Sequence, residues 1–149
     1  MSGLKKKAVP RRVQYAALPF RRGATSRVQV MLVTSRDTGR WIIPKGWPMR
    51  RKAPHASAAR EALEEAGVVG RVGRDPIGTY SYEKRLAGGS IVTCEVRVFS
   101  LEVKSQQQHW PEKEEREFHW FSPSGAANAV QEPALGAIIR SFSKTQQPT

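Results

Sequence analysis

The stretch GWPMRRKAPHASAAREALEEAGV at positions 46–68 carries most of the information about the fold. Its alanine-rich second half predicts a helix over residues 55–66, and Gly67 directly after it is a typical helix terminator. The preceding residues 45–54 contain Gly46, Pro48 and Pro54 without a helical pattern, so we expect a loop there. The segment therefore predicts a loop, a helix and a second loop.

One side of the predicted helix gathers carboxylates. At about 100° per residue, Glu61, Glu64 and Glu65 fall within an arc of about 100°. Another side is apolar and is expected to face a core; it consists of Ala59, Ala62, Leu63 and Ala66. Like charges at this spacing cost about 0.2–0.5 kcal/mol per pair. Two interpretations follow: a solvated helix face eased by Arg60 and Lys52, or a site for a hard divalent cation, which prefers oxygen ligands.

The spacing of residues across this segment resembles the signature of the Nudix hydrolase family, G-x5-E-x7-R-E-U-x-E-E-x-G-U, in which U is apolar. The matching residues are Gly46, Arg60, Glu61, Ala62, Glu64, Glu65, Gly67 and Val68. One position departs, because Lys52 stands where the signature has its first glutamate. Residues 34–48 (TSRDTGRWIIPKGWP) and 120–123 (WFSP) are similar to the diphosphoinositol-polyphosphate and diadenosine-polyphosphate branch of that family.

The resemblance implies a fold and a chemistry. The fold is α/β (α+β), an α/β/α sandwich with a mixed sheet and a loop–helix–loop catalytic motif. The chemistry is hydrolysis of a phosphoanhydride bond with Mg²⁺ or Mn²⁺. The family's metal ligands fall on Glu61, Glu64 and Glu65, with the backbone carbonyl of Lys45 as a further ligand, and in some members the residue at Glu64 is the general base. Arg60 would orient a catalytic carboxylate.

The loop before the predicted helix contains two further positions of the signature. By resemblance, Gly46 would provide the turn of the catalytic loop. Lys52 cannot bind a metal while it is protonated, so it would pair with a glutamate, contact a phosphate or stand as a surface lysine. Because the three carboxylates of the helix remain, we expect an active enzyme. The departure at Lys52 means that the family mechanism does not transfer residue by residue.

Substrate-binding residues are expected around this motif. By resemblance, Arg12, Ser35 and Arg36 line a phosphate pocket next to Lys45 and Gly46, and Trp47 is the candidate for stacking on a base. Singly, each of the three strand-end residues is equally well explained as solvent-exposed.

A second acidic run lies at residues 112–117. The resemblance implies that a glutamate of this region, Glu112 or Glu115, could act as base or further metal ligand, although such a run is more often a solvated loop. Lys84 and Arg85 lie at the tip of a predicted hairpin and could reach a substrate from there, although we interpret them as surface residues.

The rest of the chain predicts a single domain over residues 11–143, with a flexible basic arm at 1–10 and a polar tail at 144–149. Strands are expected at 12–20, 27–34, 41–43, 68–72, 77–82, 90–103 and 117–121, and a second helix at 134–142. In the strand at 27–34, Val28, Val30 and Leu32 are expected on one side.

Composition limits the class of protein. The 149 residues include 25 Lys and Arg against 13 Asp and Glu, a net charge of +12 that favours anionic partners. No run is long enough for a membrane span, the basic start has no apolar segment typical of a signal peptide, and the single Cys94 forms no internal disulfide, so we expect a cytoplasmic protein.

The expected function is a divalent-metal-dependent pyrophosphohydrolase acting on a small polyphosphate, with diadenosine polyphosphates and inositol pyrophosphates favoured. Alternative substrates are ADP-ribose, dinucleotide cofactors, nucleoside triphosphates and a 5′-triphosphate RNA end. Two alternatives of other classes are a nucleic-acid-binding module and a catalytically impaired ligand sensor with the same fold. The sequence does not predict an oligomeric state.

Overall fold

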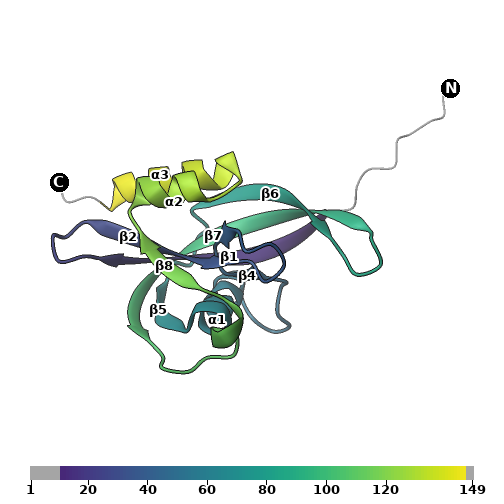
Figure 1. The fold of residues 1–149 in the computed structure, drawn as a ribbon, viewed down its shortest axis with the longest axis horizontal. Helices are drawn as coiled ribbons and strands as arrows, with labels where there is room; N and C mark the ends of the chain where they lie inside the picture. Colours follow the sequence, from purple (N-terminus) through teal and green to yellow (C-terminus); the bar gives the residue numbers. More distant parts are fainter. Residues whose placement is uncertain (1–10, 147–149) are drawn as a thin grey trace.

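The computed structural model describes residues 11–146. The arm predicted at 1–10 and the tail residues 147–149 lie outside the described residues. The chain forms a mixed eight-stranded sheet whose main path is β3–β2–β1–β7–β5, with β4, β6 and β8 paired to β1, β7 and β2 (Figure 1). The strands are β1 (Arg11–Arg22), β2 (Val28–Thr34), β3 (Trp41–Ile42), β4 (Lys45–Gly46), β5 (Val68–Val72), β6 (Gly78–Arg85), β7 (Ile91–Gln106) and β8 (Phe118–Phe121).

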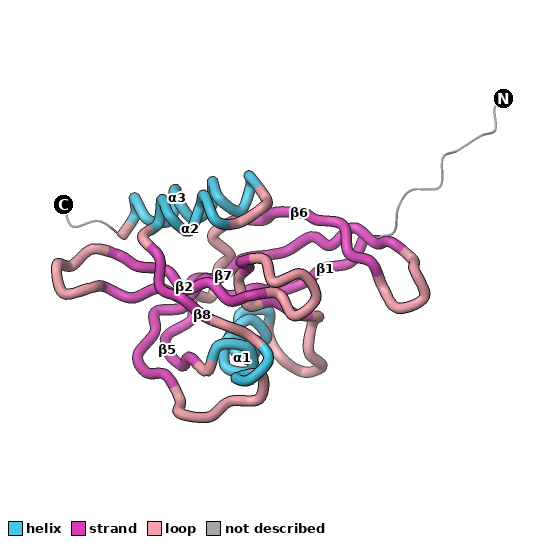
Figure 2. The backbone as a smooth tube through the Cα atoms, in the orientation of Figure 1, coloured by secondary structure: helices cyan, strands magenta, loops and turns pink. Residues whose placement is uncertain are grey.

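The two longest strands, β1 and β7, run parallel along most of their length, and the other pairs are antiparallel. Helix α1 (Pro54–Ala66) covers one face of the sheet. Helices α2 (Pro123–Ala129) and α3 (Pro133–Thr145) cover the other, as Figure 2 shows. The predicted α/β/α sandwich with a mixed sheet is therefore confirmed.

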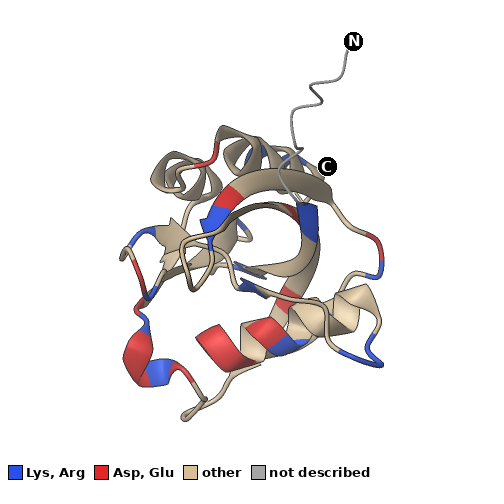
Figure 3. Cartoon of the chain, turned by 90° about the vertical axis from the view of Figure 1, so that its right-hand side faces the viewer, with Lys and Arg blue, Asp and Glu red and all other residues tan. Residues whose placement is uncertain are grey.

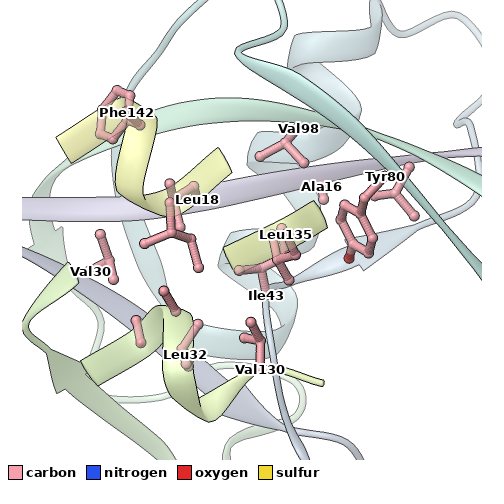
Figure 4. Close-up of a cluster of buried hydrophobic side chains, with 14 of the residues drawn as sticks. Ala16, Leu18, Val30, Leu32, Ile43, Tyr80, Val98, Val130, Leu135 and Phe142 are labelled. Atoms are coloured by element: carbon pink, nitrogen blue, oxygen red, sulfur yellow. The ribbon is translucent and has the colours of Figure 1, made fainter. Parts of the chain in front are cut away.

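Alternation along the strands divides the apolar side chains between two cores. Val28, Val30 and Leu32 of β2 pack on the side of α2 and α3, as the sequence predicts, whereas Met31 and Val33 pack on the side of α1. Figure 4 shows the first core, in which Val30 and Leu32 lie with residues of β1, β6, β7 and the two C-terminal helices. The central strands of the sheet are therefore buried on both faces.

The structure adds elements that the sequence did not predict. Residues 45–46, expected in a loop, form β4 because they pair with Tyr15 and Ala16 of β1. Helix α2 was not predicted, since seven small and polar residues carry little helical periodicity. Ser122 caps it by accepting from the Gly125 N–H at 3.1 Å.

Helix α3 runs to Thr145, three residues beyond the end predicted for this helix at 142. Within residues 11–146, no helix has the length and apolarity needed to cross a membrane.

Candidate active site

Helix α1 is set close to the sheet by small residues. Ala58, Ala62 and Ala66 are fully buried against the second core, because alanine allows the helix backbone to approach the strands. Gly67 ends the helix with φ 70°, and its N–H donates to the Leu63 carbonyl at 3.0 Å. The carboxylates in the last two turns of α1 are therefore held at a defined height above the sheet.

A cavity of about 310 Å³ lies between α1, β4, β6 and the loop that precedes β8; we call it the catalytic cavity. In Figure 3 the ribbon is red at acidic positions, which occur on α1 and on the neighbouring 3-10 turn at residues 113–115. The acidic residues that line the cavity are Asp37, Glu61, Glu64, Glu65 and Glu112, and the basic ones are Arg36, Lys45, Lys84 and Arg116. Acids that attract a cation and bases that attract an anion thus share one space.

Gly46 is required by its contact with Glu61. A Cβ atom added at Gly46 would overlap the Glu61 carboxylate, so only glycine allows that side chain to lie against β4. Gly46 lies in paired strand and is not among the glycines with positive φ. The expectation that Gly46 provides a turn is therefore wrong, and close approach of a carboxylate is the physical reason for a glycine here.

Glu65 is the most buried acid of the site, with 4% of its surface exposed. Its Oε1 is buried without a hydrogen-bond partner, and the nearest cationic group is Nη2 of Arg116 at 3.7 Å. Burial raises the pKa of Glu65 to about 8, against the opposing charge of Arg116. The sequence placed Glu65 on a carboxylate face with Glu61 and Glu64; the structure instead buries it beside the alanines of the core.

Glu61 and Glu65 influence each other's protonation. Burial raises the pKa of Glu61 as well as that of Glu65, and the neighbouring Glu61 carboxyl group raises the pKa of Glu65 further. Carboxyl groups that retain their protons in this way can exchange a proton for a cation.

Glu64 has a different environment. Its Oε1 accepts from Nε of Arg60 at 3.0 Å, one turn earlier on the helix, and the side chains of both residues are partly exposed. This contact agrees with the predicted role of Arg60 in orienting a carboxylate. Arg60 itself lies on the outer side of α1 and does not line the catalytic cavity.

All residues of the catalytic cavity lie within a segment that matches a known protein family. The family model of the NUDIX domain matches residues 10–142. The chain belongs to the Nudix family.

Among its relatives, Nudix hydrolase 13, mitochondrial, of Arabidopsis thaliana is 32% identical over 126 residues, which cover 78% of this chain and 60% of the plant protein. Diphosphoinositol polyphosphate phosphohydrolase 2 of Rattus norvegicus is 31% identical over 132 residues, covering 87% of this chain and 64% of the rat protein. This Nudix chain thus spans under two thirds of the length of both relatives. Relatives named as mitochondrial and chloroplastic occur, so family membership does not determine the compartment.

Solved structures share the fold at low identity. A binary complex of a C. elegans Ap4A hydrolase has a TM-score of 0.66 and 18% identity, covering 93% of this chain and 97% of the other. The NUDIX domain of Shewanella oneidensis NrtR, solved with ADP ribose, has a TM-score of 0.67 and 15% identity, covering 94% and 92% of the two chains. These similarities establish the Nudix fold of the chain.

Most of the residues predicted to bind substrate line the catalytic cavity of this Nudix domain; they are Ser35, Arg36, Lys45, Gly46 and Trp47. Arg12 does not line it but lies behind Trp47, with its guanidinium 5.9 Å from the centre of the indole ring.

Arg36 is not free. Its Nη1 lies 3.0 Å from Glu115 Oε1 and 3.8 Å from Glu112 Oε1, so an incoming phosphate would compete with these carboxylates.

Arg116 is the main residue that sequence reasoning missed. Its side chain is 8% exposed, and it donates to Glu112 Oε1 at 2.8 Å and to the Thr34 carbonyl at 2.9 Å. It thereby ties the loop before β8 to the end of β2 and faces Glu65. The spacing of Glu112 and Arg116, four residues apart, was the one available signal.

Lys84 lines the catalytic cavity together with Lys45, so it lies where it could reach a substrate. Gln14 and Tyr82 were also missed; the Tyr82 hydroxyl donates to Gln14 Oε1 at 2.7 Å within the cavity wall.

Lys52 lies away from these groups. It is exposed and does not line the catalytic cavity, and within residues 11–146 it makes no ion pair. The structure therefore agrees with the surface interpretation of Lys52.

The donor set suits a hard divalent cation. It consists of carboxylate oxygens, one of which, Glu65 Oε1, is buried without a donor. In the described part of the chain, no three acidic, histidine or cysteine side chains already converge as a ready cluster. The glutamates would therefore turn toward a cation as it binds.

Proposed function

We propose that this chain is a divalent-cation-dependent pyrophosphohydrolase that cleaves a phosphoanhydride bond in a nucleoside-diphosphate-linked or polyphosphate substrate. Diadenosine polyphosphates and inositol pyrophosphates are the favoured substrates. The observation that carries the proposal is the catalytic cavity, in which glutamates of α1 face Arg36, Lys45 and Lys84. Membership of the Nudix family and the name of the rat relative support it.

Glu61, Glu64 and Glu65 would hold Mg²⁺ or Mn²⁺, with the Lys45 backbone carbonyl as a further ligand. When bound, such a cation lowers the pKa of coordinated water and neutralises phosphate oxygens. Gly46 and Arg116 position this set, because Gly46 admits Glu61 and Arg116 faces Glu65 and Glu112.

Hydrolysis adds one water across a P–O–P bond, so that the attacked phosphorus gains an oxygen and the other phosphate leaves with the bridging one. One proton of the water must be accepted. Glu64 is placed for this role, because Arg60 holds its Oε1 and the side chain lines the cavity. Glu112 is the second candidate, although Arg116 already binds its Oε1.

The remaining phosphates need cationic partners. Lys45 and Lys84 line the cavity opposite α1, and Arg36 offers a planar guanidinium that can bind two oxygens of one phosphate. Trp47, 37% exposed, supplies an aromatic surface at the rim. These groups orient the chain of phosphates toward the glutamates.

The test is product release from a panel of diadenosine polyphosphates, inositol pyrophosphates, ADP-ribose, nucleoside triphosphates and triphosphorylated RNA, with Mg²⁺ or Mn²⁺. We expect cation-dependent turnover that Glu64→Gln and Glu65→Gln each reduce at least ~100-fold. Glu114→Gln is the matched control, because Glu114 is exposed and does not line the cavity.

Absence of turnover on every substrate, with the wild type and both variants binding ligand equally, would overturn the proposal in favour of a ligand sensor.

A further inference from the structure

The turn that joins β1 and β2 projects from one end of the sheet (Figure 1), and the proposed function leaves it unassigned. The hollow beside this turn is lined mainly by residues 21–29, and none of these lines the catalytic cavity. Its charged side chains are Arg21, Arg22 and Arg27, and no acid among the described residues lines it. The hollow therefore offers positive charge without neighbouring carboxylates.

Arg21 is held in place although its charge is not compensated. Its guanidinium lies 4.1 Å from the centre of the Trp120 ring, and its Nε donates to Gln29 Oε1 at 2.9 Å. Within residues 11–146, its two terminal nitrogens make no hydrogen bond or ion pair. These nitrogens can bind two oxygens of one phosphate. Because the side chain is already restricted, it loses little further conformational freedom when an anion binds.

The partner of the guanidinium distinguishes Arg21 from an arginine of the catalytic helix. The Nε of Arg60 donates to Glu64, a carboxylate that compensates its charge. The Nε of Arg21 donates to the neutral amide of Gln29 instead. A phosphate can therefore approach Arg21 without competing with a carboxylate.

The register of the hairpin places Arg27 on the same face as Arg21. Arg21 lies directly opposite Gln29, and the Gly23 N–H donates to the Arg27 carbonyl at 2.7 Å, which continues the ladder toward the turn. Side chains alternate along strands, so Arg21, Arg27 and Gln29 share one face, and Arg22 lies on the other. Diagonal neighbours across a strand pair are about 7–8 Å apart. Gly23, without a side chain, leaves the space between the two arginines open.

The exposure of these groups determines the size of the ligand. Arg21 and Arg27 are exposed, and single contacts between exposed charges are weak and are screened by salt. One free phosphate would bind poorly, whereas a chain of phosphates uses several contacts and releases its counterions. The hydroxyls of Thr25 and Ser26 and the Gln29 amide add neutral groups. Such groups can bind the accessible sugars and bases of a single strand, which inorganic polyphosphate lacks.

We infer that the β1–β2 hairpin binds the phosphodiester backbone of a single-stranded nucleic acid. Arg21 and Arg27 bind phosphates, and Gln29 is the positioning residue that holds Arg21 without neutralising it. This surface is separate from the catalytic cavity, so the inference goes beyond the proposed function and does not depend on hydrolysis.

The experiment measures Kd by fluorescence anisotropy for a labelled oligothymidylate of about 12 nucleotides. The solution contains a chelator and about 100 mM salt. The probe has a 5′-hydroxyl end and phosphodiester bonds only, so it contains no phosphoanhydride bond that the proposed reaction could cleave. We expect the wild type to bind with a Kd below about 100 µM.

The deciding variant is Gln29→Glu. It keeps the length of the side chain and the acceptor for Arg21, and it adds a carboxylate that compensates the guanidinium. We expect the Kd to rise at least ~5-fold and the log–log slope of affinity against salt to become less steep by about 1. Arg21→Gln should have the same two effects, and it serves as the test if Gln29→Glu does not fold.

The matched control is Gln131→Glu. Gln131 also accepts from an arginine, Arg40, and neither residue lines the hollow beside the hairpin. Both glutamate variants lower the net charge of the chain equally, so they share any long-range effect. Gln131→Glu should therefore change the Kd by less than about twofold.

Absence of binding by the wild type would overturn the inference, as would Kd values and slopes that neither hairpin variant changes. Equal losses in Gln29→Glu and Gln131→Glu would also overturn it, because net charge rather than the hairpin would then govern binding. Stronger competition by inorganic polyphosphate of equal charge would assign the surface to a different ligand. Turnover of the substrate panel tests the proposed function independently, so either proposal can fail alone.

Discussion

The catalytic cavity and the opposite end of the sheet both contain arginines, but they hold them differently. Near the catalytic cavity, Arg36, Arg60 and Arg116 each lie within 4.0 Å of a glutamate. At the β1–β2 turn a larger hollow of about 930 Å³, the hairpin cavity, is formed mainly by residues 21–29. There Arg21 donates to Gln29 and Arg22 to Gln146, which are neutral, and no acid among the described residues lines the hollow.

The difference shows that the net charge of the chain does not indicate where the catalytic cavity lies. The excess of +12 implied an anionic partner, yet the catalytic cavity is balanced between acids and bases, whereas the hairpin cavity has arginines and no acid in its lining. A site for a cation must concentrate carboxylates, and these must be compensated by neighbouring cations to remain in place. We therefore expect the two ends to respond differently to mutation, pH and salt.

The largest difference should appear in catalysis. Glu61→Gln removes a charged ligand and is expected to lower kcat/KM by about 100- to 1,000-fold. Arg22→Gln, at the hairpin cavity, should change it by less than about twofold. Steady-state rates on the preferred substrate with Mg²⁺ measure both. A comparable loss in the two variants would contradict the assignment of the active end.

Stability should show the next difference. Arg116→Met leaves Glu112 without its ion-pair partner and the Thr34 carbonyl without its donor, and we expect a loss of about 3 kcal/mol in the free energy of unfolding. Arg21→Met removes a guanidinium that stacks 4.1 Å from the Trp120 ring, and the expected loss is about 1 kcal/mol or less. Urea unfolding of metal-free protein gives both values. Equal losses would mean that Arg116 does not compensate the glutamates.

The pH dependence of the free energy of unfolding should come mainly from the catalytic cavity. Burial raises the pKa of Glu65 to about 8, above its value in the unfolded chain, so the folded state binds more protons between those values. Stability without metal should therefore fall as pH rises from about 5 to 8. Glu65→Gln should remove most of that slope and be the more stable protein at pH 8, by about 2 kcal/mol.

The control for this measurement is Glu114→Gln, an exposed acid, which should keep the wild-type slope. Thermal or urea unfolding in the presence of a chelator at several pH values provides the comparison. A Glu65→Gln curve parallel to that of the wild type would show that Glu65 stays ionised in the folded protein.

The smallest expected difference concerns non-specific anion binding. Replacing Arg21, Arg22 and Arg27 with glutamine should reduce the salt dependence of binding to single-stranded DNA, lowering the log–log slope by about 2. Arg60→Gln should change it less, because that arginine is already paired. Fluorescence titrations between 50 and 200 mM salt would measure the slopes. Equal slopes in all three proteins would place the anion-binding surface elsewhere.

Much of the fold could be read from local patterns. The alanine-rich run and Gly67 predicted α1, and the alternation in β2 predicted which of its side chains share a core. Helix α2 and strand β4 could not be predicted, since α2 depends on the Ser122 cap and on packing, and β4 exists only through pairing with β1. The glutamates of α1 were found by spacing, whereas Arg116 was not, because it reaches the site from a distant segment.

By itself, the sequence determined the family, the helix that bears Glu61, Glu64 and Glu65, and the position of Gly46 before it. These follow from residue type and spacing along one continuous segment. Only the tertiary structure decided that Glu65 is buried, that Gly46 serves contact rather than a turn, and that Arg21 stacks on Trp120. Burial and charge neighbourhood depend on which distant segments meet, and the packing of the two cores decides that.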